Sequence, residues 1–300
     1  MKGAKPTAIS HPLNLDRRCQ IWTELVFVSI CHQANWDRLH SRVVDIAATD
    51  FYALLPQSLS QMDSKRFDEL FGSALDSARL RRRERIALLR NLSEQSEDWL
   101  GPNCPEWVTN ANIRLSGTDG LYAWLNKIRI FSADPIQKKA RVFVHQLLRY
   151  GLIDVLDPEN IAPAVDYHLM RLYVRTGRIR PVDEWEERLK DEDSTVRIEP
   201  ITALRRAVEE SMYYTATGAN LRVDEVNHIE WQIARSFCLR KDPHCSSGPL
   251  PEKPVDEAVV NLSCRLGHCC PLSSECLAAV DSNLRELVDP QSAKSAASYY

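Results

Sequence analysis

The sequence predicts an all-α protein. Apolar residues recur at helical spacing, as in Phe143, Val144 and Leu147, whereas the alternating pattern of a strand is scarce. The chain has 300 residues, of which 44% are hydrophobic and 26% are charged, as in an ordinary globular protein. Prolines and glycines interrupt the helical pattern, most clearly at residues 101–105 and 246–254. We therefore expect helices that are joined by loops at these breaks and packed into one or two cores.

The charge balance argues mildly against a dedicated nucleic-acid binder. The formal net charge is −3, and phosphate contacts need clustered Lys and Arg. Two basic runs could supply such contacts locally, although runs of this kind are more often solvated helix faces. The first run holds Arg79, Arg81, Arg82, Arg83 and Arg85, and the second holds Lys127, Arg129, Lys138, Lys139 and Arg141.

The sequence shows neither a membrane segment nor a secretion signal. Its longest apolar stretch, Leu25–Cys31, is too short to span a bilayer, and its first ten residues lack the apolar core of a signal peptide. We therefore expect a cytoplasmic protein without membrane contact. Cysteines in that compartment mostly stay reduced.

Cysteine is concentrated near the C-terminus. Six of the nine cysteines fall between Cys238 and Cys276. Six residues separate Cys238 from Cys245 in ARSFCLRKDPHC, and five separate Cys270 from Cys276 in CPLSSEC. Because reduced thiols on short loops bind iron–sulfur clusters or zinc, this pattern favours a metal site over disulfides.

The cysteine pattern resembles the C-terminal loop of the endonuclease III-like helix-hairpin-helix DNA glycosylases. In that family a Cys-x6-Cys-x2-Cys-x5-Cys loop holds a [4Fe–4S] cluster, and the first and last spacings match. The resemblance implies as metal ligands Cys238, Cys245, Cys270 and Cys276. The middle spacing is 24 residues here instead of two, an insertion that can loop out at modest entropic cost. Cys269 and Cys264 are alternatives for the third ligand, and zinc is the alternative metal.

The segment IAPAVDYHLMRLYVRTG predicts a turn followed by a helix. Pro163 blocks an earlier start, Asp166 stands where an N-cap belongs, and Gly177 can end the helix. A capping role is the simplest interpretation of Asp166 alone. The segment also resembles the family pattern Val-Asp-x-His-x-x-Arg, which implies Asp166 as the catalytic carboxylate and His168 and Arg171 as substrate-binding residues. A carboxylate stabilises the positive charge that develops on the sugar as an N-glycosidic bond breaks.

The segment FSADPIQKKARVFVHQLL corresponds to the hairpin and the following helix of the family. Aligning Ala140 with the alanine of that helix places Lys138 on the catalytic lysine of the lyase-competent members, with Lys139 beside it at the substrate. The hairpin glycines of the family are absent, and residues 133–137 take their place. A phosphate contact through hairpin amides is therefore remodelled or lost. A solvated helix face is the alternative interpretation of both lysines.

The segment FVSICHQANWDRLHSRVV resembles the first barrel helix of these enzymes. There a Gln after small residues fills the gap that an extruded nucleotide leaves, and Gln33 is the matching candidate. We expect His32 and Asn35 to line the same pocket from neighbouring turns of one helix. An ordinary polar helix residue is the alternative interpretation of Gln33.

The resemblance implies two all-α domains with the active cleft between them. Residues 22–151 are expected to form a helical barrel, and residues 1–21 with 152–287 a second domain that carries the metal loop. Residues 288–300 are rich in Ser and Ala and are expected to form a flexible tail.

The function that the resemblance implies is base excision. A monomeric enzyme would flip a damaged or modified base out of double-stranded DNA and cleave its N-glycosidic bond, with strand cleavage if a lysine attacks the sugar. One alternative is a glycosidase acting on RNA or modified nucleosides, which the missing hairpin glycines and the acidic balance favour. Another is a non-catalytic, metal-bearing nucleic-acid binding protein in which Asp166 only caps its helix.

Overall fold

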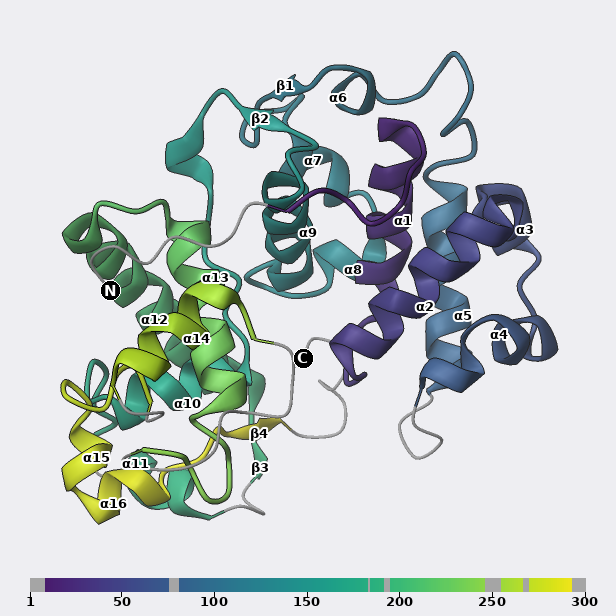
Figure 1. Cartoon of the computed structure of the whole chain (residues 1–300). Helices are drawn as coiled ribbons and strands as arrows, with labels where there is room; N and C mark the ends of the chain where they lie inside the picture. The colour runs from purple at the N-terminus through teal and green to yellow at the C-terminus, as the bar shows by residue number, and fades with distance from the viewer. Residues whose placement is uncertain are drawn as a thin grey trace. The chain divides into compact units, whose positions relative to one another are not determined.

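The computed structural model describes residues 9–75, 81–182, 184–191, 195–245, 255–266 and 270–292. These residues are mostly α-helical, and their strands are four two-residue segments, which confirms the all-α prediction. They form two compact units, residues 9–161 and residues 162–292, whose elements are labelled in Figure 1. Over the described ranges, no helix combines the length and the apolar character needed to cross a membrane.

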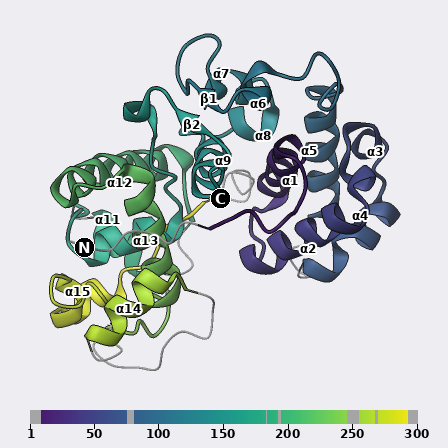
Figure 2. The same cartoon turned by 45° about the horizontal axis from the view of Figure 1, so that its top comes forward.

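The unit of residues 9–161 is built around a buried helix, α1 (Arg17–Ile30). Asp16 caps its start by accepting a hydrogen bond from the Cys19 amide at 2.9 Å, and every residue from Ile21 to Ile30 is buried. Helix α1 packs against α2 (Trp36–Thr49), α5 (Arg82–Glu94) and α9 (Lys138–Arg149) (Figure 2). A helix that is buried on all sides forms the core of its unit.

Shorter elements complete this unit. They are η1 (Phe51–Leu54), α3 (Pro56–Ser60), α4 (Ser64–Phe71), η2 (Gly72–Ala74), α6 (Glu106–Thr109), β1 (Asn112–Ile113), α7 (Leu121–Leu125), α8 (Arg129–Ser132), β2 (Asp154–Val155) and η4 (Pro158–Asn160). Strands β1 and β2 pair in parallel. Trp22, Trp99, Trp107 and Trp124 form an aromatic cluster, in which neighbouring ring centroids lie between 4.8 and 6.0 Å apart. Each such pair contributes about 0.5–1.5 kcal/mol beyond its burial.

The unit of residues 162–292 is built around α10 (Tyr167–Arg175). This helix packs against α12 (Ile198–Ala219) and α13 (Val223–Ser236). Around them lie α11 (Glu184–Lys190), β3 (Thr195–Val196), α14 (Glu257–Arg265), α15 (Leu277–Val280), α16 (Ser282–Glu286) and β4 (Gln291–Ser292), with β3 and β4 paired in parallel. Every residue of α10 from Leu169 to Arg175 is buried, including two arginines, so the helix requires polar partners inside the unit.

The boundary between the units differs from the predicted division. Residues 9–21 and 152–161 both belong to the unit of α1, although the sequence placed them in the second domain. The side chain of Arg17, in the first turn of α1, donates hydrogen bonds to the carbonyls of Val108, Asn110 and Leu152. The bond to Leu152 joins residues 152–161 to α1, which itself begins within residues 9–21, and nothing in the local sequence pattern indicates this bond.

Residues 288–292 also differ from the prediction, which assigned them to a flexible tail. The Val288 amide donates to the Leu189 carbonyl at 2.7 Å, and Asp289 is buried. The Ser- and Ala-rich composition that suggested a tail belongs to the residues after this point, which lie outside the described ranges.

Candidate active site and thiol cluster

Asp166 lies at the N-terminus of α10, where two donors orient its carboxylate. One oxygen accepts a hydrogen bond from the Leu169 amide at 3.1 Å, which confirms the predicted capping bond. The other oxygen accepts from Nε1 of Trp231 on α13 at 3.0 Å. The preceding turn is fixed as well, since the Ala164 amide donates to the Asn227 side chain at 2.7 Å. With 9% of its surface exposed, Asp166 is an oriented acceptor at the positive end of a helix.

Trp231 is a contact of the candidate site that the sequence pattern does not indicate. The guanidinium carbon of Arg235, one helical turn further along α13, lies 4.6 Å from the centroid of the Trp231 ring. Arg235 is buried and Trp231 is half-buried. The indole is therefore packed from one side while its N–H points to Asp166. The Trp and Arg stand four residues apart in the sequence, but that spacing does not identify a partner on another helix.

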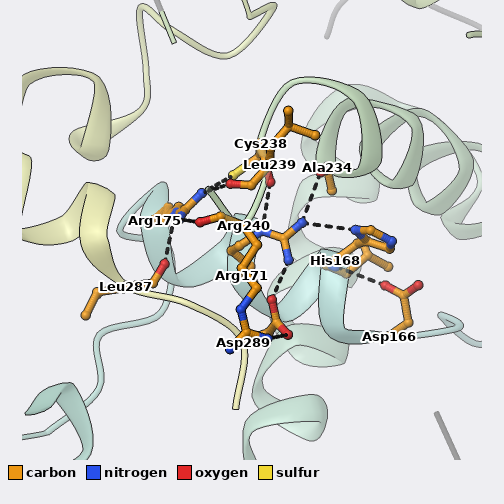
Figure 3. Close-up of polar contacts among 11 residues, drawn as sticks. Asp166, His168, Arg171, Arg175, Ala234, Cys238, Leu239, Arg240, Leu287 and Asp289 are labelled. Atoms are coloured by element: carbon orange, nitrogen blue, oxygen red, sulfur yellow. Dashed lines mark hydrogen bonds and ion pairs between the residues drawn. The ribbon is translucent and has the colours of Figure 1, made fainter. Parts of the chain in front are cut away.

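Arg171 binds the protein's own backbone and a carboxylate (Figure 3). Its Nε donates to the Cys238 carbonyl at 2.7 Å, its Nη2 donates to the Ala234 carbonyl at 3.4 Å, and its Nη1 pairs with Asp289. With 2% of its surface exposed and all three nitrogens engaged, Arg171 is not available to a substrate. This corrects the predicted substrate-binding role. A buried guanidinium is stable only when its charge and its N–H groups are paired in this way.

His168 shares the helix face of Arg171. Its Nδ1 lies 3.0 Å from Nη2 of Arg171, and its ring packs on the Tyr167 ring with 4.1 Å between centroids. His168 is half-buried and Tyr167 is exposed. Because a guanidinium can only donate, Nδ1 of His168 is the acceptor and Nε2 carries the proton of the neutral ring. His168 therefore remains a candidate for substrate contact through Nε2.

Arg175 lies one turn further along α10 and anchors the start of the cysteine loop (Figure 3). Its guanidinium donates to the carbonyls of Leu239 at 2.5 Å, Arg240 at 3.0 Å and Leu287 at 2.7 Å. Its Nη1 also lies 3.6 Å from Sγ of Cys238. The C-terminal half of α10 thus fixes the backbone on which the first cysteine of the loop is carried.

Gly177 follows the C-cap of α10 and lies against the last part of the cysteine loop. Its φ is 77°, and a Cβ at this position would lie 2.3 Å from Cδ1 of Leu277. Cys276, the neighbour of Leu277, donates from Sγ to the Arg175 carbonyl at 3.6 Å. The positive φ therefore favours glycine here, and a side chain would also displace that of Leu277. The end of α10 contacts both the first and the last predicted metal ligand.

The four predicted ligand thiols lie near one another. Burial, followed by the effects of the Cys238, Cys276 and Cys245 thiols, raises the pKa of Cys270 to about 12. Burial likewise raises the pKa values of Cys245 and Cys276, and Cys238 contributes to both shifts. Within the described ranges, however, no three His, Cys, Asp or Glu side chains are arranged to hold a metal ion.

The three candidates for the third ligand are placed differently. Cys270 is buried and its thiol interacts with those of the other three predicted ligands. Cys264 is exposed on α14, and Cys269 lies outside the described residues. The structure therefore favours Cys270 over Cys264.

In the other unit, residues 133–137 form a hairpin between α8 and α9, and its amides are already occupied. The Asp134 carboxylate accepts hydrogen bonds from the amides of Ile136 at 3.2 Å and Lys138 at 2.9 Å, with 3% of Asp134 exposed. Gln137 precedes α9 with a φ of 52°, a conformation that glycine usually supplies. An internal carboxylate therefore takes N–H groups that such a turn could offer to a phosphate.

The two lysines at the start of α9 have different surroundings. Lys138 is half-buried, whereas only 3% of Lys139 is exposed. Nζ of Lys139 donates to the Ser29 carbonyl at 3.2 Å and lies 3.2 Å from Nδ1 of His32. Burial is the main cause that lowers the pKa of Lys139 from 10.5 to about 7. Lys139 therefore caps the C-terminal end of α1 and is also partly neutral near neutral pH.

Residues 31–35 form a turn, where the sequence predicted a continuous helix. Helix α1 ends at Ile30 and α2 begins at Trp36. Gln33 is exposed with a φ of 51°, and Asn35 caps α2 by accepting from the Arg38 amide at 3.1 Å. His32 is buried. Gln33, His32 and Asn35 therefore do not share one helix face, because the helix ends before all three; their place at a substrate pocket stays a prediction.

Three arginines of the first basic run have partners within the protein, whereas Arg83 is exposed and Arg79 lies outside the described residues. Arg81 pairs with Glu84 at 2.9 Å, and Arg82 pairs with Asp68 at 2.7 Å. Arg85 is buried and donates to the carbonyls at the end of α1 and just after it, at 3.0 and 2.6 Å. Phosphate contacts from Arg81 or Arg82 would need these pairs to open.

Comparison with known proteins adds no family name to these contacts. No protein-family model matches the chain, and no curated protein matches its sequence. Its chemistry is therefore inferred from its own residues and their surroundings.

Proposed function

We propose that the protein is an N-glycosylase that removes a damaged or modified base from double-stranded DNA. One observation carries the proposal: α10 orients Asp166 at its N-terminus and, through Arg171 and Arg175, holds the start of a four-thiol cluster. The same order of aspartate, helix and cysteine loop is that of the glycosylases which VDYHLMR resembles. The contacts and the sequence pattern therefore support the same chemistry.

Asp166 supplies negative charge to the sugar as the glycosidic bond breaks. Departure of the base leaves an oxocarbenium-like sugar, and a fixed carboxylate lowers the energy of that state. The Leu169 amide and the Trp231 indole hold the carboxylate without cancelling its charge, because both donors are neutral. A water molecule that the carboxylate orients then completes hydrolysis when no amine takes part.

For a lyase step, the lowered pKa favours Lys139 over Lys138, but only 3% of Lys139 is exposed, so the attack requires the chain around Nζ to open. An amine attacks C1′ of the sugar only in its neutral form, and the pKa of Lys139 is lowered to about 7. The attack displaces the base and forms a Schiff base. Because Lys139 also caps α1, its substitution affects stability as well as chemistry.

The resemblance of the loop favours a [4Fe–4S] cluster over a single zinc ion, although four cysteine sulfurs are a usual donor set for both. The thiols of Cys238, Cys245, Cys270 and Cys276 would hold it, and the Cys270 thiol interacts with the other three. When bound, the cluster would join these four positions and contribute to the folding of their unit.

Metal analysis of the anaerobically purified full chain tests the cofactor. We expect about four irons with matching sulfide per chain, and loss of both in Cys276→Ser. Cys264→Ser, which changes an exposed cysteine near the loop, is the matched control and should keep its iron. Stoichiometric zinc in place of iron would refute the cluster, and iron loss in the control would move the third ligand to Cys264.

Asp166→Asn tests the catalytic role. Asn keeps an oxygen that can cap α10 but removes the negative charge, so base release should fall by about 100-fold or more while duplex binding persists. The assay measures free base released from duplexes that each carry one deaminated, oxidised or alkylated base. Asp63→Asn is the control, since Asp63 caps α4 in the same way, with 2.7 Å to the Arg66 amide. Unchanged base release in Asp166→Asn would eliminate the catalytic assignment.

A glycosidase for RNA or modified nucleosides is the second candidate. Two observations favour it: Asp134 occupies the hairpin amides, and the net charge is −3. The salt dependence of duplex binding separates the two candidates, because several phosphate contacts make affinity fall steeply with salt. Base release from nucleosides without salt-dependent duplex binding would favour this second function.

A further inference from the structure

Lys139, His32 and Glu84 form a line of polar groups within the unit of residues 9–161. Nζ of Lys139 lies 3.2 Å from Nδ1 of His32, and Nε2 of His32 lies 3.8 Å from Oε1 of Glu84. Both Nε2 of His32 and Oε1 of Glu84 are buried atoms without a hydrogen-bond partner among the described residues. The Glu84 side chain is 31% exposed, so the line leads from a buried amine toward solvent.

The hydrogen-bonding roles along this line follow from the chemistry of its groups. A lysine ammonium can only donate, so Nδ1 of His32 accepts from Lys139 and the ring proton lies on Nε2. That N–H faces Oε1 of Glu84, which is an acceptor. A shift of about 1 Å in the Glu84 side chain brings the pair to hydrogen-bond distance. Lys139 is therefore the donor, His32 accepts at Nδ1 and donates at Nε2, and Glu84 is the final acceptor.

Burial and the neighbouring charges favour loss of a proton from the inner end of the line, where Lys139 and His32 lie. The other charged or titratable groups that act on its inner end are Cys31, Arg81, Arg85 and Lys138. Burial is the largest cause that lowers the pKa of Lys139, and it also lowers that of His32, so neither group holds a proton easily. Glu84 is the carboxylate of the line: its Oε1 is buried, its Oε2 pairs with Arg81 at 2.9 Å, and 31% of its side chain is exposed.

We propose that His32 and Glu84 are positioning residues that relay the proton of Lys139 to solvent. Lys139 passes a proton to Nδ1 of His32 as Nε2 passes its own proton to Oε1 of Glu84, which then releases it to water. The products are a neutral amine, a neutral imidazole in its other tautomer and one free proton. Use of the amine in a lyase step rests on the proposed function, whereas the relay does not.

The relay is tested on the full chain without DNA, through exchange of the Lys139 Nζ protons with water, measured by nitrogen-15 NMR at pH 6. In Glu84→Gln we expect exchange to slow by about tenfold or more, because the terminal acceptor is lost. Electrostatics alone predicts the opposite, since removal of a neighbouring negative charge makes the ammonium more acidic. Glu94→Gln, in the last turn of the same helix, is the matched control and should exchange like the wild type.

A second variant, His32→Gln, keeps an acceptor for Lys139 but cannot pass a proton on. It should slow exchange to a similar extent, and unchanged or faster exchange in both variants would overturn the relay. Borohydride trapping on a duplex with an abasic site is scored separately. Slowed exchange without a trapped adduct would refute the lyase role and leave the relay standing. A trapped adduct with unaltered exchange in both variants would refute the relay and leave the lyase role standing.

Discussion

The buried cations of α10 and of α9 are accommodated in opposite ways. In the unit of residues 162–292, the guanidinium nitrogens of Arg171 and Arg175 all have partners among backbone carbonyls, Asp289, His168 and a thiol. In the unit of residues 9–161, Lys139 meets a carbonyl and a neutral imidazole, with other cations close by. The first arrangement holds charge permanently, whereas the second makes charge easy to lose.

The choice of residue type matches this difference. Arginine stays protonated in proteins, so a buried arginine must be paired, and five donors allow it to hold several loops at once. Lysine can release its proton when burial is not compensated. Burial of a polar side chain alone therefore does not identify a reactive group. A buried cation whose charge is fully paired is structural, whereas one whose charge is poorly paired can lose its proton and react.

The largest effect that this comparison predicts is that of replacing Arg171. Arg171→Met should lower the free energy of unfolding of its unit by up to about 3–5 kcal/mol, because Asp289 loses its buried cationic partner and keeps the more exposed Arg240 at 3.2 Å. Denaturant unfolding of the full chain, followed through the tryptophans, measures the change. Arg206→Met changes an exposed arginine on α12 and should stay within about 0.5 kcal/mol of the wild type.

A double variant sharpens this test. Arg171→Met combined with Asp289→Leu removes both charges, so it should lose clearly less stability than the two single changes added together. Strict additivity would show that the pair is not coupled, and Arg171 would then return as a candidate for substrate contact.

The parts of the site that the sequence could predict depend on local signals. Pro163, Asp166 and Gly177 mark a helix start and end within one short segment, and the structure has both. The turn at residues 31–35 has a local signal as well, since Asn35 stands at an N-cap position, but the resemblance of the segment to the first barrel helix favoured one helix. In the fold the local signal holds, and the capping bond of Asn35 marks the start of a separate helix.

The parts that the sequence could not predict depend on distant contacts. Arg171 pairs with Asp289 across 118 positions, and Trp231 donates to Asp166 across 65 positions. A motif alignment gives Arg171 a place beside the substrate, yet its partners decide that it is structural. Likewise Asp134 resembles any turn residue until its carboxylate is found on two hairpin amides. Long-range pairing of polar groups is set by the packed chain and not by sequence spacing.

The smaller predicted effect concerns Lys139, whose contribution to the free energy of unfolding depends on pH. The pKa of Lys139 falls from 10.5 to about 7 on folding, so between these values the unfolded chain binds a proton that the folded protein lacks. Stability from this group therefore rises with pH over that window, and below about pH 7 the cost of burying the ammonium is fully present. Relative to Lys139→Met, the wild type should gain up to about 1.4 kcal/mol per pH unit between about pH 7 and 10.

Denaturant unfolding of both proteins at half-unit pH steps measures this slope. Lys138→Met is the control, because it removes the same type of charge from the neighbouring, less buried position. A pH-independent difference between the wild type and Lys139→Met would mean that Lys139 keeps its proton in the folded protein. In that case the lysine is as fully compensated as the arginines of α10, and the contrast between the two units, together with the nucleophilic role of Lys139, fails.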